Sequence, residues 1–369
     1  MIEPTKSIKV SESNYIPRFH NVNHTDFNRA IRTKVQAYFE SKKKSQTGNW
    51  SLYFKAILLW LSYFLLYTHL VFFTPNPWLG ILECLVLGIL TAGIGFNVMH
   101  DGGHGSFSNS KFINFIAANS VNLLGASALM WHTKHNVIHH TYTNIAGVDD
   151  DIDLKPFVRM SPAQDRYLLH RFQFIYVWML YPLLLIFWVF YSDFRKYFSG
   201  KIGIIKIQNF KITQHFTFWL AKIVYFVIML VIPIYFVGFL PWLIGYLILS
   251  FTAGLILSVV FQLAHTVEEA SFPEPTETTH EIENEWAIHQ VNTTVNFATK
   301  SKMVSWFVGG LNFQIEHHLF PKISHVHYPA ISKIIRETCD EFQIKYNEYS
   351  NVWNAIVSHT RHLKKMGIA

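Results

Sequence analysis

The sequence predicts an all-α integral membrane protein with four transmembrane helices, interfacial helices and a cytosolic helical cap that carries a histidine-rich metal site. Three observations predict this class. Half of the 369 residues are apolar and only 15% are charged, well below the ~25% that is usual in soluble domains. Long apolar runs alternate with polar stretches, and three clusters of histidines lie beyond the ends of these runs.

Four apolar segments are long enough to be membrane spans, because about 20 helical residues cross a hydrocarbon core of ~30 Å. They are residues 52–73, 79–99, 217–237 and 240–264. The turn inside each pair carries no charge, whereas lysines and arginines precede the first and third spans. The positive-inside rule therefore predicts a multi-pass protein with both termini and the long connections in the cytoplasm.

Two further apolar segments, 112–131 and 171–191, are predicted to be interfacial or re-entrant. The first contains several asparagines and the second contains Pro182. The three histidine clusters can share one site only if an even number of crossings separates each consecutive pair.

The spans divide the chain into three parts. Residues 1–50 are predicted to be a cytosolic N-terminal segment without the apolar core of a signal peptide. Residues 51–330 form the membrane domain, and 331–369 form a cytosolic C-terminal segment with helical periodicity near 329–365. The two cysteines, Cys84 and Cys339, are too few for a disulfide framework.

The three histidine clusters are HDGGH at 100–104, HNVIHH at 135–140 and QIEHH at 314–318. Imidazole suits iron, copper, nickel and zinc. Histidines four apart on an α-helix project from one face, and His140 is rotated from His139 by about 100°, which suits a second metal. His265 ends the fourth span and adds an eighth imidazole. Gln314 is a weaker donor that binds weakly or through water. The predicted ligands are His100, His104, His135, His139, His140, His265, His317, His318 and Gln314.

Polar residues near the clusters are predicted to accept hydrogen bonds from the ligands and so to fix their tautomers. The candidates are Asp101, Gln262, Glu316, Asp149, Asp153, Gln290 and His289. For the acidic run 149–153 a solvated loop is an equal alternative, and for His289 an ordinary surface position. The other histidines are expected at the surface or in structural roles, His132 being the one with some claim to ligation.

The three motifs resemble the histidine boxes of the integral membrane fatty acid desaturases, whose forms are HxxxH, HxxHH or HxxxHH, and HxxHH or QxxHH. Gln314 and the stretch from Trp286 to Phe297 are similar to the front-end and linoleoyl-CoA, delta-6-like, branch of that family. The resemblance covers roughly residues 50–330, which would make 51–330 the desaturase domain. Many front-end members carry a fused cytochrome b5 domain with an HPGG motif, and this sequence has no HPGG.

The resemblance implies an oxidoreductase that inserts a cis double bond into an acyl-CoA or an acyl-lipid. It implies a non-haem di-iron centre, O₂ as co-substrate and no catalytic side chains beyond the metal ligands. Electrons would come from a separate carrier of the ferredoxin, flavodoxin or cytochrome b5 type. Membrane lipids are the other expected partners, and nucleic acid is not expected.

Two alternatives to a desaturase remain at this point. Hydroxylases, ketolases and alkane monooxygenases share the same histidine scaffold, and a non-catalytic membrane haem or metal carrier is a more remote reading. Haem-b cytochromes hold their histidines within facing spans, whereas these clusters lie beyond the helix ends. The carbon that is desaturated, the acyl carrier and the oligomeric state are left open.

Overall fold

The computed structural model describes residues 8–10, 16–207, 209–276 and 278–369. The predicted N-terminal segment 1–50 therefore lies partly outside the described residues. Within it the structure has a short strand, β1 (Ile8–Val10), a second strand, β2 (Arg18–Phe19), and one long helix, α1 (Phe27–Lys42).

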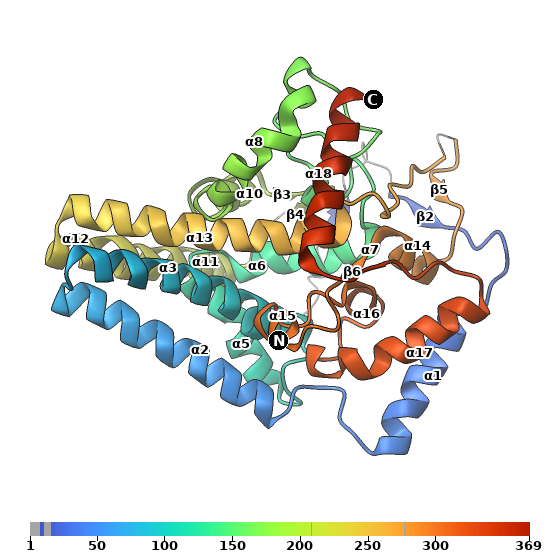
Figure 1. The fold of residues 1–369 in the computed structure, drawn as a ribbon, viewed down its shortest axis with the longest axis horizontal. Helices are drawn as coiled ribbons and strands as arrows, with labels where there is room; N and C mark the ends of the chain where they lie inside the picture. The colour runs from blue at the N-terminus through green and yellow to red at the C-terminus, as the bar shows by residue number, and fades with distance from the viewer. Residues whose placement is uncertain (1–7, 11–15, 208, 277) are drawn as a thin grey trace.

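Four long apolar helical segments lie side by side and form an elongated bundle (Figure 1). The first is α2 (Trp50–Thr68) with the π-helical turn η1 (His69–Phe73). The second is α3 (Pro77–Ile94), followed by η2 (Gly95–Met99) and α4 (His100–His104). The third is α11 (Ile212–Phe226) with η8 (Val227–Val231) and α12 (Ile232–Val237). The fourth is α13 (Phe239–His265). All four are long and apolar enough to cross a membrane, and they coincide with the four predicted spans.

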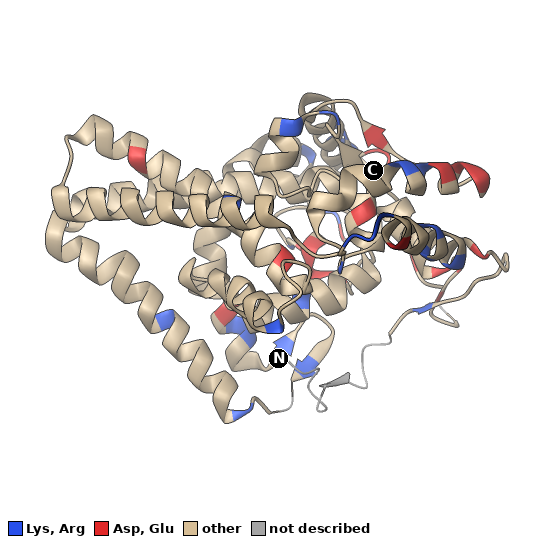
Figure 2. Cartoon of the chain, turned by 90° about the horizontal axis from the view of Figure 1, so that it is seen from below, with Lys and Arg blue, Asp and Glu red and all other residues tan. Residues whose placement is uncertain are grey.

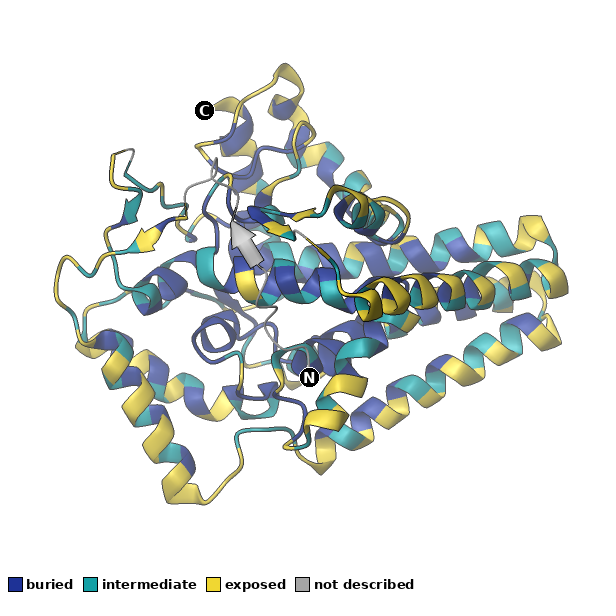
Figure 3. Cartoon of the chain, turned by 180° about the vertical axis from the view of Figure 1, so that it is seen from behind, coloured by how far each residue is buried: buried dark blue, intermediate teal, exposed yellow. Residues whose placement is uncertain are grey.

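The outward faces of the bundle are apolar. Large hydrophobic side chains such as Phe54, Leu65, Ile223 and Leu240 are exposed there, and Figure 3 shows exposed positions recurring along these helices. An apolar surface of this extent is not stable in water. Together with the unbroken backbone hydrogen bonding of helices, it is what a hydrocarbon solvent requires. The chain is a membrane protein.

A fifth apolar stretch, Leu168–Ser199, is also long enough to cross a membrane by length and composition. It consists of η5 (Leu168–Phe172), α8 (Gln173–Leu180), η6 (Tyr181–Leu183), α9 (Leu184–Phe187), η7 (Trp188–Ser192) and α10 (Asp193–Ser199). It contains the predicted interfacial segment 171–191. Figure 1 shows it running across the bundle helices and not alongside them. The crossing is close: a Cβ on Gly254 of α13 would lie 2.3 Å from the carbonyl oxygen of Pro182.

The predicted interfacial segment 112–131 is two helices and not one. The first, α5 (Lys111–Leu123), meets the continuous run of α6 (Ala128–His132), η3 (Thr133–His139) and α7 (His140–Tyr142) at a bend of 111°. The bend contains Gly125 with a φ of +95°, a conformation that glycine adopts without strain. Ser127 then starts α6, its hydroxyl accepting from the backbone N–H of Met130.

A buried ion pair fixes this bend against the bundle. Lys222 of α11 donates to Asp193 of α10 at 2.9 Å and to the carbonyl oxygen of Gly125 at 2.6 Å. Asp193 also accepts from the backbone N–H of Ser127 at 2.7 Å and from the indole N–H of Trp188 at 3.1 Å. Lys222 is 2% exposed and Asp193 is fully buried. Three elements that are distant in the sequence are therefore held by one pair of charges.

A second helical layer covers one end of the bundle (Figure 1). Its helices are α1, α14 (Trp286–Thr293), α15 (Lys302–Phe307), α16 (Gln314–Leu319), α17 (Tyr328–Glu341) and α18 (Val352–Ile368). Phe27 and Ile31 of α1 share one apolar core with Ile331 and Ile335 of α17. The predicted helical stretch 329–365 is interrupted, because α17 and α18 are separated by a turn and a short strand.

The described residues also contain short strands that the all-α prediction omits. Strands β1, β4 (Ile205–Ile207) and β3 (Lys201–Ile202) form an antiparallel sheet in which Ile8 faces Ile207 and Lys201 faces Lys206. β2 pairs in parallel with β5 (Glu281–Ile282), and β6 (Asn296–Phe297) pairs in parallel with β7 (Glu348–Tyr349). Each has two or three residues, so these strands fasten loops and do not form a layer of the fold.

Candidate metal centre

The first histidine cluster is the last turn of the second bundle segment. His100 and His104 are the first and last residues of α4, and their rings lie 4.7 Å apart between centroids. A Cβ on Gly103, between them, would lie 2.2 Å from the ring of Trp131. Because the ring of Trp131 packs this closely against α4, only glycine fits at position 103. The prediction that His100 and His104 project from one face of a helix is confirmed.

The second cluster is built on a π-helix, which the sequence analysis does not predict. η3 covers Thr133–His139, and His140 begins α7. A π-helix has a wider turn than an α-helix because its hydrogen bonds join residues five apart. Residues four and five apart therefore share a face, so His139 and His140 both lie beside His135 and are not splayed by the 100° of an α-helix. Their ring centroids are 5.2 and 4.7 Å from that of His135.

The third cluster and His265 complete the centre. His317 and His318 lie on the short helix α16, and His265 is the last residue of α13. The ring of His265 is 4.9 Å from that of His318, and the ring of His317 is 4.5 Å from that of His100. The structure thus brings all eight predicted histidines together, from four separate parts of the chain. Seven of them are buried and His104 is partly exposed.

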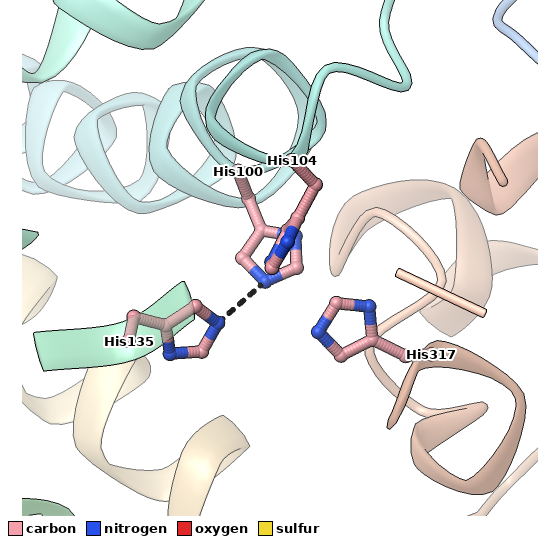
Figure 4. Close-up of side chains that lie close together, drawn as sticks. All are labelled: His100, His104, His135 and His317. Atoms are coloured by element: carbon pink, nitrogen blue, oxygen red, sulfur yellow. Dashed lines mark hydrogen bonds between the residues drawn. The ribbon is translucent and has the colours of Figure 1, made fainter. Parts of the chain in front are cut away.

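The eight histidines form two adjoining groups. In the first, ring nitrogens of His100, His104, His135 and His317 all lie within 4.8 Å of one another. Figure 4 shows these four rings pointing toward one another, with 3.2 Å between the Nε2 atoms of His100 and His135. In the second group, nitrogens of His139, His265 and His318 meet the same limit. His140 lies between the groups, within the same limit of both His317 and His318.

The inward nitrogens of the cluster lack partners, which tests whether a metal fits. The Nε2 atoms of His104, His265, His317 and His318 are buried and make no hydrogen bond within the described residues. A buried polar atom without a partner costs about 1–3 kcal/mol. Two of the four belong to each histidine group, so each group has buried nitrogens free for a ligand that imidazole binds. The histidine clusters could therefore hold metal ions.

The protonation of the third cluster is compatible with metal binding. Burial, together with the neighbouring histidine rings, holds the pKa of His317 and of His318 well below its ordinary value. Both rings are neutral at physiological pH, and a neutral imidazole has the lone pair that a metal needs.

Second partners orient the rings by binding their Nδ1 atoms. His139 donates to Asp149 at 3.0 Å, and His318 donates to the amide oxygen of Gln290 at 2.8 Å. His265 contacts the carbonyl oxygen of Thr293 at 3.3 Å. An Nδ1–H donor leaves the lone pair on Nε2, so each of these bonds fixes the tautomer that can bind a metal.

Three of the other predicted supporting residues accept hydrogen bonds from neighbouring residues that are not ligands, and none from the ligand rings. Asp101 accepts from His325 at 3.0 Å and from Ser324 at 2.7 Å. Glu316 accepts from Tyr346 at 2.6 Å and from Asn296 at 2.8 Å. Burial raises the pKa of Glu316 to about 7 although these two hydrogen bonds favour its charged form.

The third of these residues is Gln262, which accepts from Thr266 at 2.7 Å. This bond joins the last turn of α13 to the residue after it, and no histidine takes part.

Three predicted residues make no hydrogen bond to a ligand ring within the part of the chain that the structure describes. Asp153 is exposed and accepts only from the backbone N–H of Lys155, so the structure does not bring it to the centre. His289 is buried, packs against Phe19 and has an unpaired Nε2. Gln314 is 1% exposed and its amide oxygen has no partner. That unpaired oxygen is what a weak or water-mediated ligand requires.

Several residues that the structure places at the site are not among the predicted candidates. Tyr328 contacts Nδ1 of His317 at 3.1 Å, and Thr143 lies 3.3 Å from Nδ1 of His318. His325 is buried and bonded to Asp101, the structural role that was one of its two expected positions. Asp151 lies 3.3 Å from Nδ1 of His139. Of these, only Asp151 could have been found, because it belongs to the acidic run that the sequence analysis singles out.

Comparison with known proteins identifies the family. A family model described as fatty acid desaturase matches residues 76–350. Two sn-1 linoleoyl-lipid 6-desaturases are similar to the chain. That of Arthrospira platensis is 37% identical over 93% of this chain and 93% of its own length, and that of Synechocystis sp. is 36% identical over 93% and 96%. An acyl-lipid (8-3)-desaturase from Physcomitrium patens is 35% identical over 95% of this chain and 73% of its own length.

The matched segment contains all eight clustered histidines, and the relatives cover the chain almost from end to end. The resemblance of the three motifs is thereby confirmed. The chain belongs to the fatty acid desaturase family and is an oxidoreductase that desaturates acyl chains.

Proposed function

We propose that this enzyme desaturates a linoleoyl chain that is esterified in a membrane lipid, inserting a cis double bond at the sixth carbon. The observation that carries the chemistry is the set of buried, unpaired imidazole nitrogens that converge from four parts of the chain. The observation that supports the substrate is the similarity to two sn-1 linoleoyl-lipid 6-desaturases over more than nine-tenths of the chain.

The centre is proposed to hold two iron ions. His100, His104, His135 and His317 would hold one, and His139, His265 and His318 the other, with His140 between them and Gln314 as a weak or water-mediated donor. Imidazole nitrogens suit iron, and family membership supports the choice of metal. Bound iron supplies the O₂-dependent chemistry that an unactivated C–H bond requires, since no side-chain base can remove such a proton.

The chain's own residues hold and orient this centre and keep water out. Asp149, Gln290 and Thr293 fix the ring tautomers through Nδ1. Seven of the eight histidines are buried, so bulk water is excluded from the reacting atoms. Asp101 and Glu316 anchor the segments that carry the first and third clusters.

We also propose the membrane topology that the sequence predicts. The four bundle segments cross the membrane, and both termini, the metal centre and residues 331–369 lie in the cytoplasm. The crosswise course of Leu168–Ser199 in Figure 1 supports an interfacial position for that stretch. The 111° bend between α5 and α6 likewise supports a segment that does not cross. Electrons would reach the cytoplasmic centre from a separate carrier.

The function is tested by expressing the chain in a host that lacks polyunsaturated lipids and supplying linoleic acid. We expect a trienoic C18 acid whose new bond lies between the carboxyl group and the existing bonds, with its position fixed by mass spectrometry of derivatised esters. Release of sn-1 chains by a position-specific lipase should recover it. A hydroxy acid in place of the new double bond would overturn desaturation, and a product on CoA alone would overturn the lipid-linked substrate.

Replacement of Gln290 should impair the metal centre without removing a ligand. In Gln290→Leu, Nδ1 of His318 loses its 2.8 Å acceptor, so the ring is no longer held in one tautomer. Loss of such a partner typically lowers metal affinity or activity by 10–100-fold. Iron content and product yield should both fall, and Gln290→Glu, which keeps an acceptor, should retain more of each. Equal activity of Gln290→Leu and the unchanged enzyme would contradict the role.

A further inference from the structure

A surface cavity of about 760 Å³ lies beside the segment that follows α16, the helix that carries the third histidine cluster. It is lined by α1, by the start of α14 and by the segment that follows α16. Arg32, Gln36, Trp286 and Lys322 are among the lining residues. Leu319 and Phe320, which follow His318 in the chain, line it as well. The segment that includes His318, Leu319 and Phe320 therefore borders the metal centre at one end and the cavity at the other.

Trp286 connects the cavity to the centre. Its indole Nε1 donates to the carbonyl oxygen of His140 at 3.2 Å, and His140 is the residue whose ring lies between the two histidine groups. The indole is partly exposed, and the guanidinium of Arg32 lies 5.8 Å from its ring centroid. One side chain thus contacts both a surface cation and the residue at the middle of the site.

A second contact from the same helix reaches the other side of the centre. Gln290 lies one turn after Trp286 on α14, and its amide oxygen accepts from His318. Helix α14 is therefore hydrogen-bonded to residues of two different histidine clusters.

The surface around the cavity is basic. From Phe27 to Lys44 the chain has six lysines and arginines against one acidic residue, Glu40, which lines the cavity. One of the six, Lys34, is paired with Glu341. Lys322 adds a further exposed cation at the rim. Figure 2, seen from the side on which α1 lies, shows that most charged residues, basic and acidic, lie at the end of the molecule away from the bundle. Tryptophan and arginine are enriched at the centres of protein interfaces, and a basic surface favours an acidic partner.

The position of the cavity favours a soluble partner over a lipid headgroup. Figure 1 shows α1 and α17 beyond the end of the bundle at which α13 terminates, away from the turns at the other end. The apolar faces that would contact hydrocarbon belong to the bundle helices. A ligand in this cavity approaches from the aqueous side.

We propose that this basic cavity surface docks an acidic one-electron carrier protein and that Trp286 lies on the path by which its electrons reach the metal centre. The proposal rests on the proposed desaturase function. One –CH₂–CH₂– unit and one O₂ give –CH=CH– and two waters, which requires two electrons and two protons from outside the substrate. Two reduced carriers each give up one electron and are oxidised, O₂ is reduced, and the two protons come from solvent.

The docking half of the proposal is tested by binding. The probe is an acidic [2Fe–2S] ferredoxin, and the full chain is held in lipid nanodiscs. The variant carrying both Arg32→Glu and Lys322→Glu should bind it at least ~10-fold more weakly, and the dependence of affinity on salt should become shallower. Arg361→Glu, an exposed arginine on α18, is the matched control and should bind as the unchanged chain does. Equal affinity of the double variant and the control would overturn the docking surface.

The electron path is tested by the rate at which the chain oxidises reduced ferredoxin in stopped flow. At ferredoxin concentrations that saturate binding, Trp286→Leu should still slow this oxidation by about 10-fold or more, whereas reduction by dithionite, a small molecule, should be unchanged. Trp353→Leu, an exposed tryptophan on α18, should behave normally. If Trp286→Leu and Trp353→Leu oxidise ferredoxin equally fast, the path is wrong. If ferredoxin oxidation depends on Trp286 but no donor yields a new double bond, the proposed function fails and this inference stands.

Discussion

His139→Ala should abolish the new double bond completely. The ring that it removes is one of three in the second histidine group, and its Nδ1 is held by Asp149 at 3.0 Å. Two imidazoles and an open space would remain where a metal needs a fuller set of ligands. The fatty-acid profile of a host expressing this variant should match that of the empty host, and the iron content of the purified protein should fall with it.

His132→Ala is the matched control. His132 lies on the helical run that carries the second cluster but belongs to none of the groups that could hold a metal. Its removal should leave both product and iron content near those of the unchanged enzyme. Survival of desaturation in His139→Ala, or equal loss in both variants, would show that the ligand assignment is wrong.

Asp193→Ala should destabilise the protein by about 3–5 kcal/mol, the usual cost of leaving one partner of a buried ion pair alone. Lys222 would keep two carbonyl acceptors but lose its only charged partner in the described structure. The backbone N–H of Ser127 and the indole of Trp188 would lose their acceptor as well. Thermal unfolding in one fixed detergent should show a midpoint lower by several degrees.

Two comparisons separate the buried charge from a general loss of contacts. The variant with both Asp193→Leu and Lys222→Met removes both charges and should be more stable than Asp193→Ala, because no unpaired ion remains. Lys34→Ala removes a surface partner of Glu341 and should cost about 1 kcal/mol or less. A midpoint for Asp193→Ala equal to that of Lys34→Ala would contradict the role of the buried pair.

The sequence predicts the bundle well because length and hydropathy are the physical requirements of a long apolar helix. All four predicted spans are such helices, and their ends differ from the prediction by a few residues. By length and composition, Leu168–Ser199 is as suitable for a span as the other four segments. Its direction across α13, where Gly254 lies close to Pro182, leaves no periodic pattern in the sequence.

The site shows the same division. The eight histidines are predictable because they are rare, clustered and placed at helix ends. Their relative orientation is not, because the π-helix at 133–139 changes which residues share a face. The supporting residues follow no spacing rule: Asp149 contacts a ligand whereas Asp153, four residues further on, is exposed. Tyr328 and Thr143 come from segments with no distinguishing composition, so only the folded chain brings them to the rings.

The order in which the chain supplies its histidines has a consequence for biosynthesis. His100 and His318 belong to one assembly, yet two of the four bundle helices lie between them in the chain. A ribosome that has made only the first two clusters has made a partial set of ligands, without His265, His317 and His318. Stable capture of metal must then wait for nearly the whole membrane domain. Bound metal would thus distinguish finished molecules from stalled or truncated ones, whose incomplete set of ligands would bind metal weakly.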